Sequence, residues 1–295
     1  MKAARFDYSC PVTLNDALAG LQGAEAMGKP MAGSQSLGPM LNLRLARPPA
    51  VVDISRVAEM RQVERRGDRL RVGAAVTHAE IEDGVHELLR GHPMQHVAQR
   101  IAYRAVRNRG TLGGSLAHAD PAADWVVVCA GLDARIEIAG PQQAMRRESV
   151  QQFMAGAYTT SLQEGELIVA VDVPAFSAES RFGYYKFCRK TGEFAEASCV
   201  AWFDPASRTA RIVLGAIDAT PRSLTALAHA CAKTGRSAVT EASIRSAVAH
   251  ALPEKDDVER HLYETAVTRC LDQALNGASP VAEPSFERKA SEIAR

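Results

Sequence analysis

The sequence has no apolar segment approaching the about 20 consecutive residues that a membrane-spanning helix needs. Its longest apolar run near the middle, residues 125–130, is far too short. The N-terminus also lacks the apolar core of a secretory signal, because Asp7 stands where that core would lie. These two absences predict a soluble protein, without a membrane span, of a bacterial-type cytoplasm or an equivalent compartment.

Clustered metal ligands are lacking as well. No two of the six cysteines form a C-x-x-C pair, and the eight histidines are scattered without an H-E-x-x-H motif. Zinc and iron–sulfur sites require thiolates or imidazoles at short spacing. We therefore expect no metal on this chain, so that any iron of a redox enzyme would be bound by another chain.

An excess of charge of one sign is the third absence. The chain has 35 Lys and Arg residues against 34 Asp and Glu residues, for a net charge of +1. This balance gives no global electrostatic reason to bind nucleic acid or an anionic membrane. Apolar residues make up 46% of the composition and charged residues 23%, which is ordinary for a globular protein. A length of 295 residues predicts about two domains.

Local patterns predict a mixed α+β fold. In the first 176 residues, strands are expected at 51–54, 70–76, 135–138 and 167–173, and helices at 13–27, 78–90 and 94–105. Thr13 is the expected N-cap of the first helix. Residues 125–130 are apolar throughout and fit a buried helix or a buried strand.

Strands precede helices in the remainder of the chain. Antiparallel strands are expected at 182–188, 198–203 and 211–217, followed by helices at 223–234, 241–250 and 257–275. This order indicates an α+β unit and not a βαβ repeat. We therefore divide the chain into a domain of residues 1–176 with subdomains 1–58 and 59–176, a second domain of residues 177–285, and a loosely held tail of residues 286–295.

Two stretches, 32–39 (AGSQSLGP) and 108–116 (NRGTLGGSL), combine glycine with hydroxyl side chains. The first is not a P-loop, because Pro39 stands where the lysine is required, and no G-x-G-x-x-G follows a strand. Small residues in series let the backbone approach an anion closely, and successive N–H groups form an array of donors. Two such stretches indicate a diphosphate site, and ordinary tight turns are the alternative.

Residues 32–48 and 108–124 resemble the two FAD loops of the medium, FAD-binding subunit of the molybdenum hydroxylases, typified by the carbon monoxide dehydrogenase medium subunit. Xanthine dehydrogenase carries the same domain. The likeness continues through 167–174 and 184–195 and extends to about residue 285. It implies a two-subdomain FAD-binding domain of the vanillyl-alcohol-oxidase type, followed by a C-terminal three-stranded antiparallel sheet with a helix bundle.

The resemblance also implies which residues hold the cofactor. The two loops would wrap the FAD pyrophosphate and ribityl chain, largely through main-chain N–H groups. Outside the loops, Asp124 would hold FAD by hydrogen bonding, Ile168 would line the flavin pocket and Lys186 would contact the cofactor. The implied FAD-binding residues are Ala32, Gly33, Ser34, Gln35, Ser36, Leu37, Thr111, Leu112, Gly113, Gly114, Ser115, Asp124, Ile168 and Lys186. No catalytic side chain and no metal ligand is expected among them.

Some residue roles stay open at this point. Asp124 could instead cap a helix that starts near Trp125, and Lys186 could extend its charge to solvent from a half-buried strand. Tyr184 and Tyr185 are both candidates for an aromatic ring near the isoalloxazine.

The first loop departs from the family at one position. It often reads Ala-Gly-Gly in the family, whereas Ser34 replaces the second glycine here. A serine at that position is expected to donate its N–H only with a negative φ.

The resemblance implies an FAD-binding electron-transfer subunit of a molybdopterin and iron–sulfur hydroxylase, which passes electrons from iron–sulfur clusters to an external acceptor. FAD would be bound non-covalently here. Molybdopterin and [2Fe-2S] clusters would lie on a large and a small partner subunit, assembled as a dimer of heterotrimers. Two alternatives stay open: a self-sufficient FAD-dependent oxidoreductase that acts directly on a small molecule, and a non-redox binding or assembly protein with a vestigial FAD fold.

Overall fold

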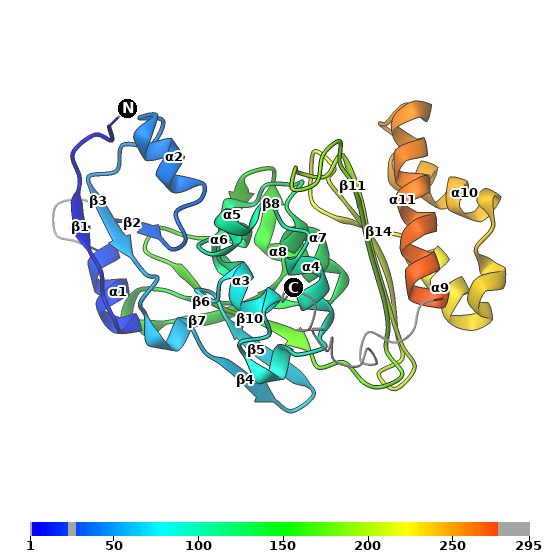
Figure 1. Cartoon of the computed structure of the whole chain (residues 1–295), viewed down its shortest axis with the longest axis horizontal. Helices are drawn as coiled ribbons and strands as arrows, with labels where there is room; N and C mark the ends of the chain where they lie inside the picture. The colour runs from blue at the N-terminus through cyan, green and yellow to red at the C-terminus, as the bar shows by residue number, and fades with distance from the viewer. Residues whose placement is uncertain (1, 23–27, 277–295) are drawn as a thin grey trace, which may run out of the picture.

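The computed structural model describes residues 2–22 and 28–276, which form three units side by side (Figure 1). We call them the N-terminal unit, the central unit and the C-terminal unit, and each is built on its own sheet. The predicted tail of residues 286–295 lies outside the described residues. None of the helices in residues 2–22 and 28–276 is long and apolar enough to cross a membrane.

The N-terminal unit holds a three-stranded parallel sheet in the order β1 (Asp7–Ser9), β3 (Ala50–Asp53), β2 (Gly28–Met31). Helix α1 (Leu14–Leu21) begins after Thr13, whose side chain accepts a hydrogen bond from the Asp16 N–H, as predicted for an N-cap. The helix ends at Leu21, so the predicted extension to residue 27 is wrong at residue 22, and residues 23–27 lie outside the described residues.

The central unit is a five-stranded antiparallel sheet in the order β4 (Val63–Arg66), β5 (Arg69–Gly73), β10 (Leu167–Pro174), β6 (Arg135–Ala139), β7 (Met145–Ser149). The three inner strands were predicted. The two edge strands were not, because their sequences, VERR and MRRES, carry the charge that exposed edges favour and lack an apolar pattern.

Helices of the central unit are shorter than predicted. The segment 78–90 splits into α3 (His78–Glu82) and the 3₁₀ turn η2 (Glu87–Leu89), and 94–105 splits into α4 (Pro93–Ala98) and α5 (Arg104–Arg107). A left-handed residue lies at each break, Gly84 with φ +62° and Ala102 with φ +41°. A left-handed backbone ends a right-handed helix, which the apolar periodicity does not reveal.

Short elements complete the first two units: α2 (Leu37–Asn42), η1 (Ala58–Met60), α6 (Leu112–His118), η3 (Pro141–Gln143), α8 (Val150–Phe153), β8 (Met154–Gly156) and β9 (Thr159–Thr160). Residues 125–130 lie in helix α7 (Asp124–Gly131), every residue of which is buried. An isolated apolar run cannot distinguish helix from strand, and burial on all sides explains why α7 lacks a polar face.

The C-terminal unit is an antiparallel sheet of four strands, β11 (Arg181–Phe187), β12 (Ala197–Asp204), β13 (Thr209–Gly215) and β14 (Arg222–Ser223). The predicted three strands are therefore corrected to four, since β14 is only two residues long and carries no pattern. Helices α9 (Thr225–Thr234), α10 (Glu241–Ala251) and α11 (Asp257–Asn276) follow, with the turn η4 (Gly235–Ala238) after α9.

Helix α7 joins the central and C-terminal units. A Cβ atom added at Gly131 would lie 2.8 Å from the Val200 Cβ, and one added at Gly215 would lie 2.7 Å from a Val127 methyl group. Glycine at these two positions thus allows α7 to approach β12 and β13 closely. Helix α7 is consequently held at the boundary between the two units. The predicted division at residue 176 lies between β10 and β11, which belong to different sheets.

Candidate functional site

The two glycine-bearing loops meet in the structure. A Cβ atom added at Gly33 would overlap the Arg109 carbonyl oxygen and lie 2.8 Å from the Gly110 Cα. Only glycine permits this approach of one backbone to another. The loops, far apart in the sequence, therefore form one surface.

The first loop turns sharply after Gly33. Ser34 has φ +62°, so the negative φ on which donation by its N–H was expected to depend is not adopted, and the chain occupies the left-handed region that glycine favours. Two hydrogen bonds close the turn: the Gly38 N–H donates to the Ser34 carbonyl at 3.0 Å, and the Gln35 side-chain amide donates to the Gly33 carbonyl at 3.0 Å. Helix α2 begins directly after Ser36.

The second loop is the start of a helix. Thr111 is the N-cap of α6, and its Oγ1 accepts a hydrogen bond of 3.1 Å from the Gly114 N–H. The Ser115 N–H donates to the Thr111 carbonyl at 3.0 Å. These N–H groups are used within the helix start, as capping requires.

The same loop is tied to the chain that follows β5. The Leu112 N–H donates to the Val76 carbonyl at 3.1 Å, and the Gly113 N–H donates to the Ala74 carbonyl at 2.9 Å. A Cβ atom at Gly113 would lie 3.0 Å from the Ala74 Cα. In this conformation the N–H groups of residues 112–115 are all donated inside the protein, and Gly113 serves the packing of α6 against the central unit.

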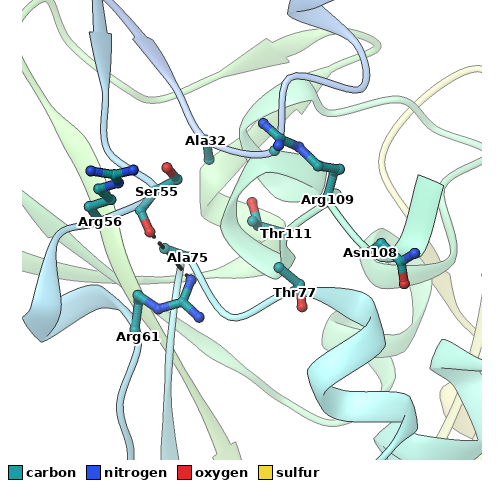
Figure 2. Close-up of a pocket in the computed structure, with 10 residues that line it drawn as sticks. Ala32, Ser55, Arg56, Arg61, Ala75, Thr77, Asn108, Arg109 and Thr111 are labelled. Carbon is teal, nitrogen blue, oxygen red and sulfur yellow. Dashed lines mark hydrogen bonds between the residues drawn. The ribbon is translucent and has the colours of Figure 1, made fainter. Parts of the chain in front are cut away.

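A cavity of about 470 Å³ opens where the two loops meet (Figure 2). Its size lies within the range of small-molecule sites in proteins. It is lined by Ala32, Gly33, Ser55, Arg56, Arg61, Ala75, Thr77, Asn108, Arg109 and Thr111. Of the residues implied by the resemblance, only Ala32, Gly33 and Thr111 line it.

Three arginines surround this cavity, with Arg56 and Arg61 on one side and Arg109 on the other (Figure 2). The Arg61 guanidinium is 2.6 Å from a carboxylate oxygen of Glu80. Within residues 2–22 and 28–276, Arg56 and Arg109 form no ion pair. The cavity therefore has a surplus of positive charge, and guanidinium groups form strong hydrogen bonds with phosphate oxygens.

The sequence reasoning missed the arginines because they have no shared pattern. Arg56 and Arg61 follow β3 outside any recognised motif. Arg109 lies inside the second stretch, 108–116, where the pattern of glycine and hydroxyl residues gives no role to its charge.

Asp124 and Lys186 form a second, buried cluster. The Lys186 Nζ is 2.9 Å from the Asp124 Oδ1, and both side chains are only 5% exposed. The Tyr184 hydroxyl donates to the same carboxylate. The N-cap of α7 is Ala123, so Asp124 is not a capping residue, and the alternative of a lysine that extends to solvent is also wrong. Burial, with the nearby Asp124 charge, raises the pKa of Tyr184 well above its usual value.

The two neighbouring tyrosines lie on opposite faces of β11. Tyr184 is completely buried and faces α7. Tyr185 faces α11, where its hydroxyl accepts a hydrogen bond from Arg269 and the guanidinium lies 5.1 Å from the ring centre. Neither ring lines the cavity between the loops.

Ile168 lies on β10, next to a bulge in its pairing with β6, and is 5% exposed. It is part of the apolar core and does not line the cavity.

A buried histidine connects the second loop to α7. The backbone N–H of His78 donates to the Gly110 carbonyl at 2.9 Å, and the Trp125 indole N–H donates to the His78 Nδ1 at 3.0 Å. Burial lowers the pKa of His78 to about 3, with the Arg107 charge contributing. His78 thus contacts the loop that lines the cavity through its backbone N–H, and the helix that carries Asp124 through its neutral imidazole.

Comparison with known proteins identifies the family of this chain. Residues 4–176 match the family described as the FAD binding domain in molybdopterin dehydrogenase. This chain belongs to that family. Over 279 residues it is 30% identical to the carbon monoxide dehydrogenase medium chain of Hydrogenophaga pseudoflava, an alignment that covers 93% of this chain and 97% of the relative. It is 37% identical to the nicotine 6-hydroxylase medium subunit of Paenarthrobacter nicotinovorans, over 67% of this chain and 69% of that subunit.

The fold agrees with solved structures of the same kind. A chain in the crystal structure of quinoline 2-oxidoreductase from Pseudomonas putida 86 superposes with a TM-score of 0.83 at 30% identity, covering 95% of this chain and all of that one. The protein is therefore an FAD-binding medium subunit of the molybdenum hydroxylases and an oxidoreductase subunit of a multi-subunit complex. In the described part of the chain, no group of three or more His, Cys, Asp or Glu side chains could hold a metal ion.

Proposed function

We propose that this chain is the electron-transfer subunit of its complex and holds FAD non-covalently, with the diphosphate in the cavity between the two loops. The observation that carries the proposal is the backbone contact of Gly33 with Arg109 and Gly110, which places two small-residue loops and three arginines around one cavity. A diphosphate with two negative charges fits this chemistry. The N-terminal unit and the central unit both contribute residues to the lining of the cavity. This arrangement supports a two-subdomain FAD-binding domain of the vanillyl-alcohol-oxidase type.

The residue assignment follows from what is still available to a ligand. Ala32, Gly33 and Thr111 line the cavity, and the guanidinium groups of Arg56 and Arg109 have no ion pair within the described residues. Because the N–H groups of residues 112–115 are donated inside the protein, we propose that side-chain guanidinium groups neutralise most of the diphosphate charge.

The remaining residues implied by the resemblance are proposed to support the cofactor from farther away. Ser34, Gln35, Ser36 and Leu37 form the turn that leads into α2. Asp124 and Lys186 form the buried pair between α7 and β11, and Ile168 belongs to the apolar core. We propose that none of these residues performs proton transfer on a substrate.

Bound FAD exchanges electrons singly or in pairs, which is the chemistry that it supplies. We propose that electrons come from [2Fe-2S] clusters on a small partner subunit and leave to an external acceptor, while a large partner subunit holds the molybdopterin. The relatives named medium chain and medium subunit support this division of labour, since this chain covers 97% and 69% of them respectively. A dimer of heterotrimers is the assembly we propose.

The proposal is tested with the full chain and FAD. We expect the purified protein to bind one FAD and turn yellow. Arg109→Gln should raise the FAD dissociation constant about tenfold or more, because a hydrogen bond to a charged group contributes roughly 1.5–3 kcal/mol. Arg245→Gln, on the exposed side of α10, is the matched control and should not change the dissociation constant.

Two results would contradict the proposal. A chain that remains colourless with excess FAD would favour a vestigial fold. Substrate oxidation by the isolated yellow chain, without partner chains that contain molybdenum and iron, would favour a self-sufficient oxidoreductase.

A further inference from the structure

A buried polar cluster crosses the boundary between the central and C-terminal units. Asp124 belongs to α7, whereas Tyr184 and Lys186 belong to β11. The Lys186 Nζ is 2.9 Å from the Asp124 Oδ1 and 3.2 Å from its Oδ2, so it bridges both oxygens. The Tyr184 hydroxyl donates to the Oδ1 alone. No member of the cluster lines the cavity between the loops.

Lys186 and Tyr184 have different effects on the carboxylate. A buried carboxylate is stable only when its charge is paired and its oxygens accept hydrogen bonds. The Lys186 ammonium supplies the charge, but it contacts both oxygens and so sets no rotation of the group. The Tyr184 hydroxyl contacts one oxygen from a rigid, completely buried ring, and therefore fixes the orientation of the Asp124 carboxylate.

A second contact fixes the chain just before Asp124. The Ala216 N–H of the C-terminal unit donates to the Pro121 carbonyl at 3.1 Å. The C-terminal unit thus holds the α7 entry by its backbone and the Asp124 side chain by Tyr184.

From this geometry, and on the basis of the proposed function, we propose that Tyr184 is a positioning residue for FAD. It acts by fixing the carboxylate of Asp124, which is proposed to support the cofactor from beyond the cavity, and it does not contact the cofactor with its ring. Since Tyr184 belongs to β11, the C-terminal unit contributes to FAD binding through this hydroxyl.

The test uses Tyr184→Phe in the full chain, with Tyr185→Phe as the matched control. Both changes remove one hydroxyl from adjacent residues, but the Tyr185 hydroxyl faces Arg269 on α11. We expect the FAD dissociation constant to rise about tenfold for Tyr184→Phe and to stay within twofold of wild type for Tyr185→Phe. An unchanged constant for Tyr184→Phe would overturn the proposal.

Visible circular dichroism of the bound flavin separates positioning from loss of fold. At saturating FAD the occupancy of all variants is equal, so a merely structural role would leave the spectrum unchanged. We expect Tyr184→Phe and Asp124→Asn to give the same altered spectrum, and Tyr185→Phe to give that of wild type. A wild-type spectrum for Tyr184→Phe would overturn the proposal.

A double-mutant cycle completes the test. If Tyr184 acts through Asp124, then adding Tyr184→Phe to Asp124→Asn should change the FAD dissociation constant less than twofold. A further tenfold loss in the double variant would show that Tyr184 acts independently and would overturn the proposal. Failure of the proposed function is distinguishable, because the wild-type chain itself would then bind no FAD.

Discussion

Ser34 shows how a single residue can be recognised as unusual while its geometry is not foreseen. The sequence marked it as a departure from a glycine, but serine by itself favours negative φ. The approach of Gly33 to Arg109 fixes the path of the loop, and the next residue must follow it at φ +62°. A contact distant in sequence thus overrides the local preference.

We expect Ser34→Gly to increase the free energy of unfolding by about 0.5–1 kcal/mol. Glycine removes the cost of the left-handed backbone, roughly 1–2 kcal/mol, and this exceeds the entropy that glycine loses on folding. Urea denaturation measures the difference. The matched control is Ser36→Gly, where φ is −104° and glycine should destabilise. Equal effects at the two positions would contradict the explanation.

At the scale of elements, the apolar strands and long helices could be predicted from periodicity, whereas helix breaks and charged edge strands could not. β5, β6 and β10 have strong apolar patterns, but β4 and β7 are held by pairing with them and need none of their own. Likewise, a left-handed residue interrupts each predicted helix, Gly84 after α3 and Ala102 between α4 and α5. The hydrogen bond between Trp125 of α7 and His78 of α3 could not be predicted either, because it joins residues far apart in the sequence.

This link predicts a pH dependence of stability. The pKa of His78 is lowered to about 3 from an ordinary value of 6.5, so the unfolded chain binds a proton that the folded chain does not. Stability from this group is fully present above pH 6.5 and is lost as the pH falls from 6.5 toward 3. The loss approaches about 1.4 kcal/mol per pH unit.

Urea denaturation between pH 7 and pH 4 tests this. His78→Gln should flatten the slope by about one proton, and His250→Gln, an exposed change at the end of α10, is the control for the substitution itself. His92, whose pKa burial lowers to about 4, contributes a similar slope that persists in both variants. An unaltered slope in His78→Gln would contradict a buried neutral imidazole.

At the scale of the whole molecule, the proposed FAD site draws on all three units, because the cavity lies between the first two and Lys186 belongs to the third. The resemblance identified both loops, Asp124 and Lys186, because each lies in a recognisable local motif. It could not predict that Asp124 pairs with Lys186, or that Arg56, Arg61 and Arg109 meet around one cavity, because those contacts depend on how the sheets pack. The motifs therefore predict which segments hold FAD, and the structure adds the arrangement of charges around the cavity.

The Asp124–Lys186 pair joins two units and is proposed to support FAD binding. Its contribution to stability and its contribution to FAD binding can be measured separately in the same variants. Lys186→Met should lower the free energy of unfolding by about 3–5 kcal/mol, because it leaves a buried carboxylate without its counter-ion. Adding Asp124→Leu removes that charge and should restore most of the stability. FAD binding, measured by flavin fluorescence, should be lost in the single variant and should stay lost in the double variant.

The exposed pair of Arg189 and Glu196 is the control for this experiment. Its side chains are 80% and 37% exposed, so Arg189→Met should change the free energy of unfolding by less than about 1 kcal/mol. Recovery of FAD binding together with stability in the double variant would show that the Asp124 and Lys186 charges serve only to join the units. Recovery of stability alone would show that the same buried charges that join the two units are also needed to hold the cofactor.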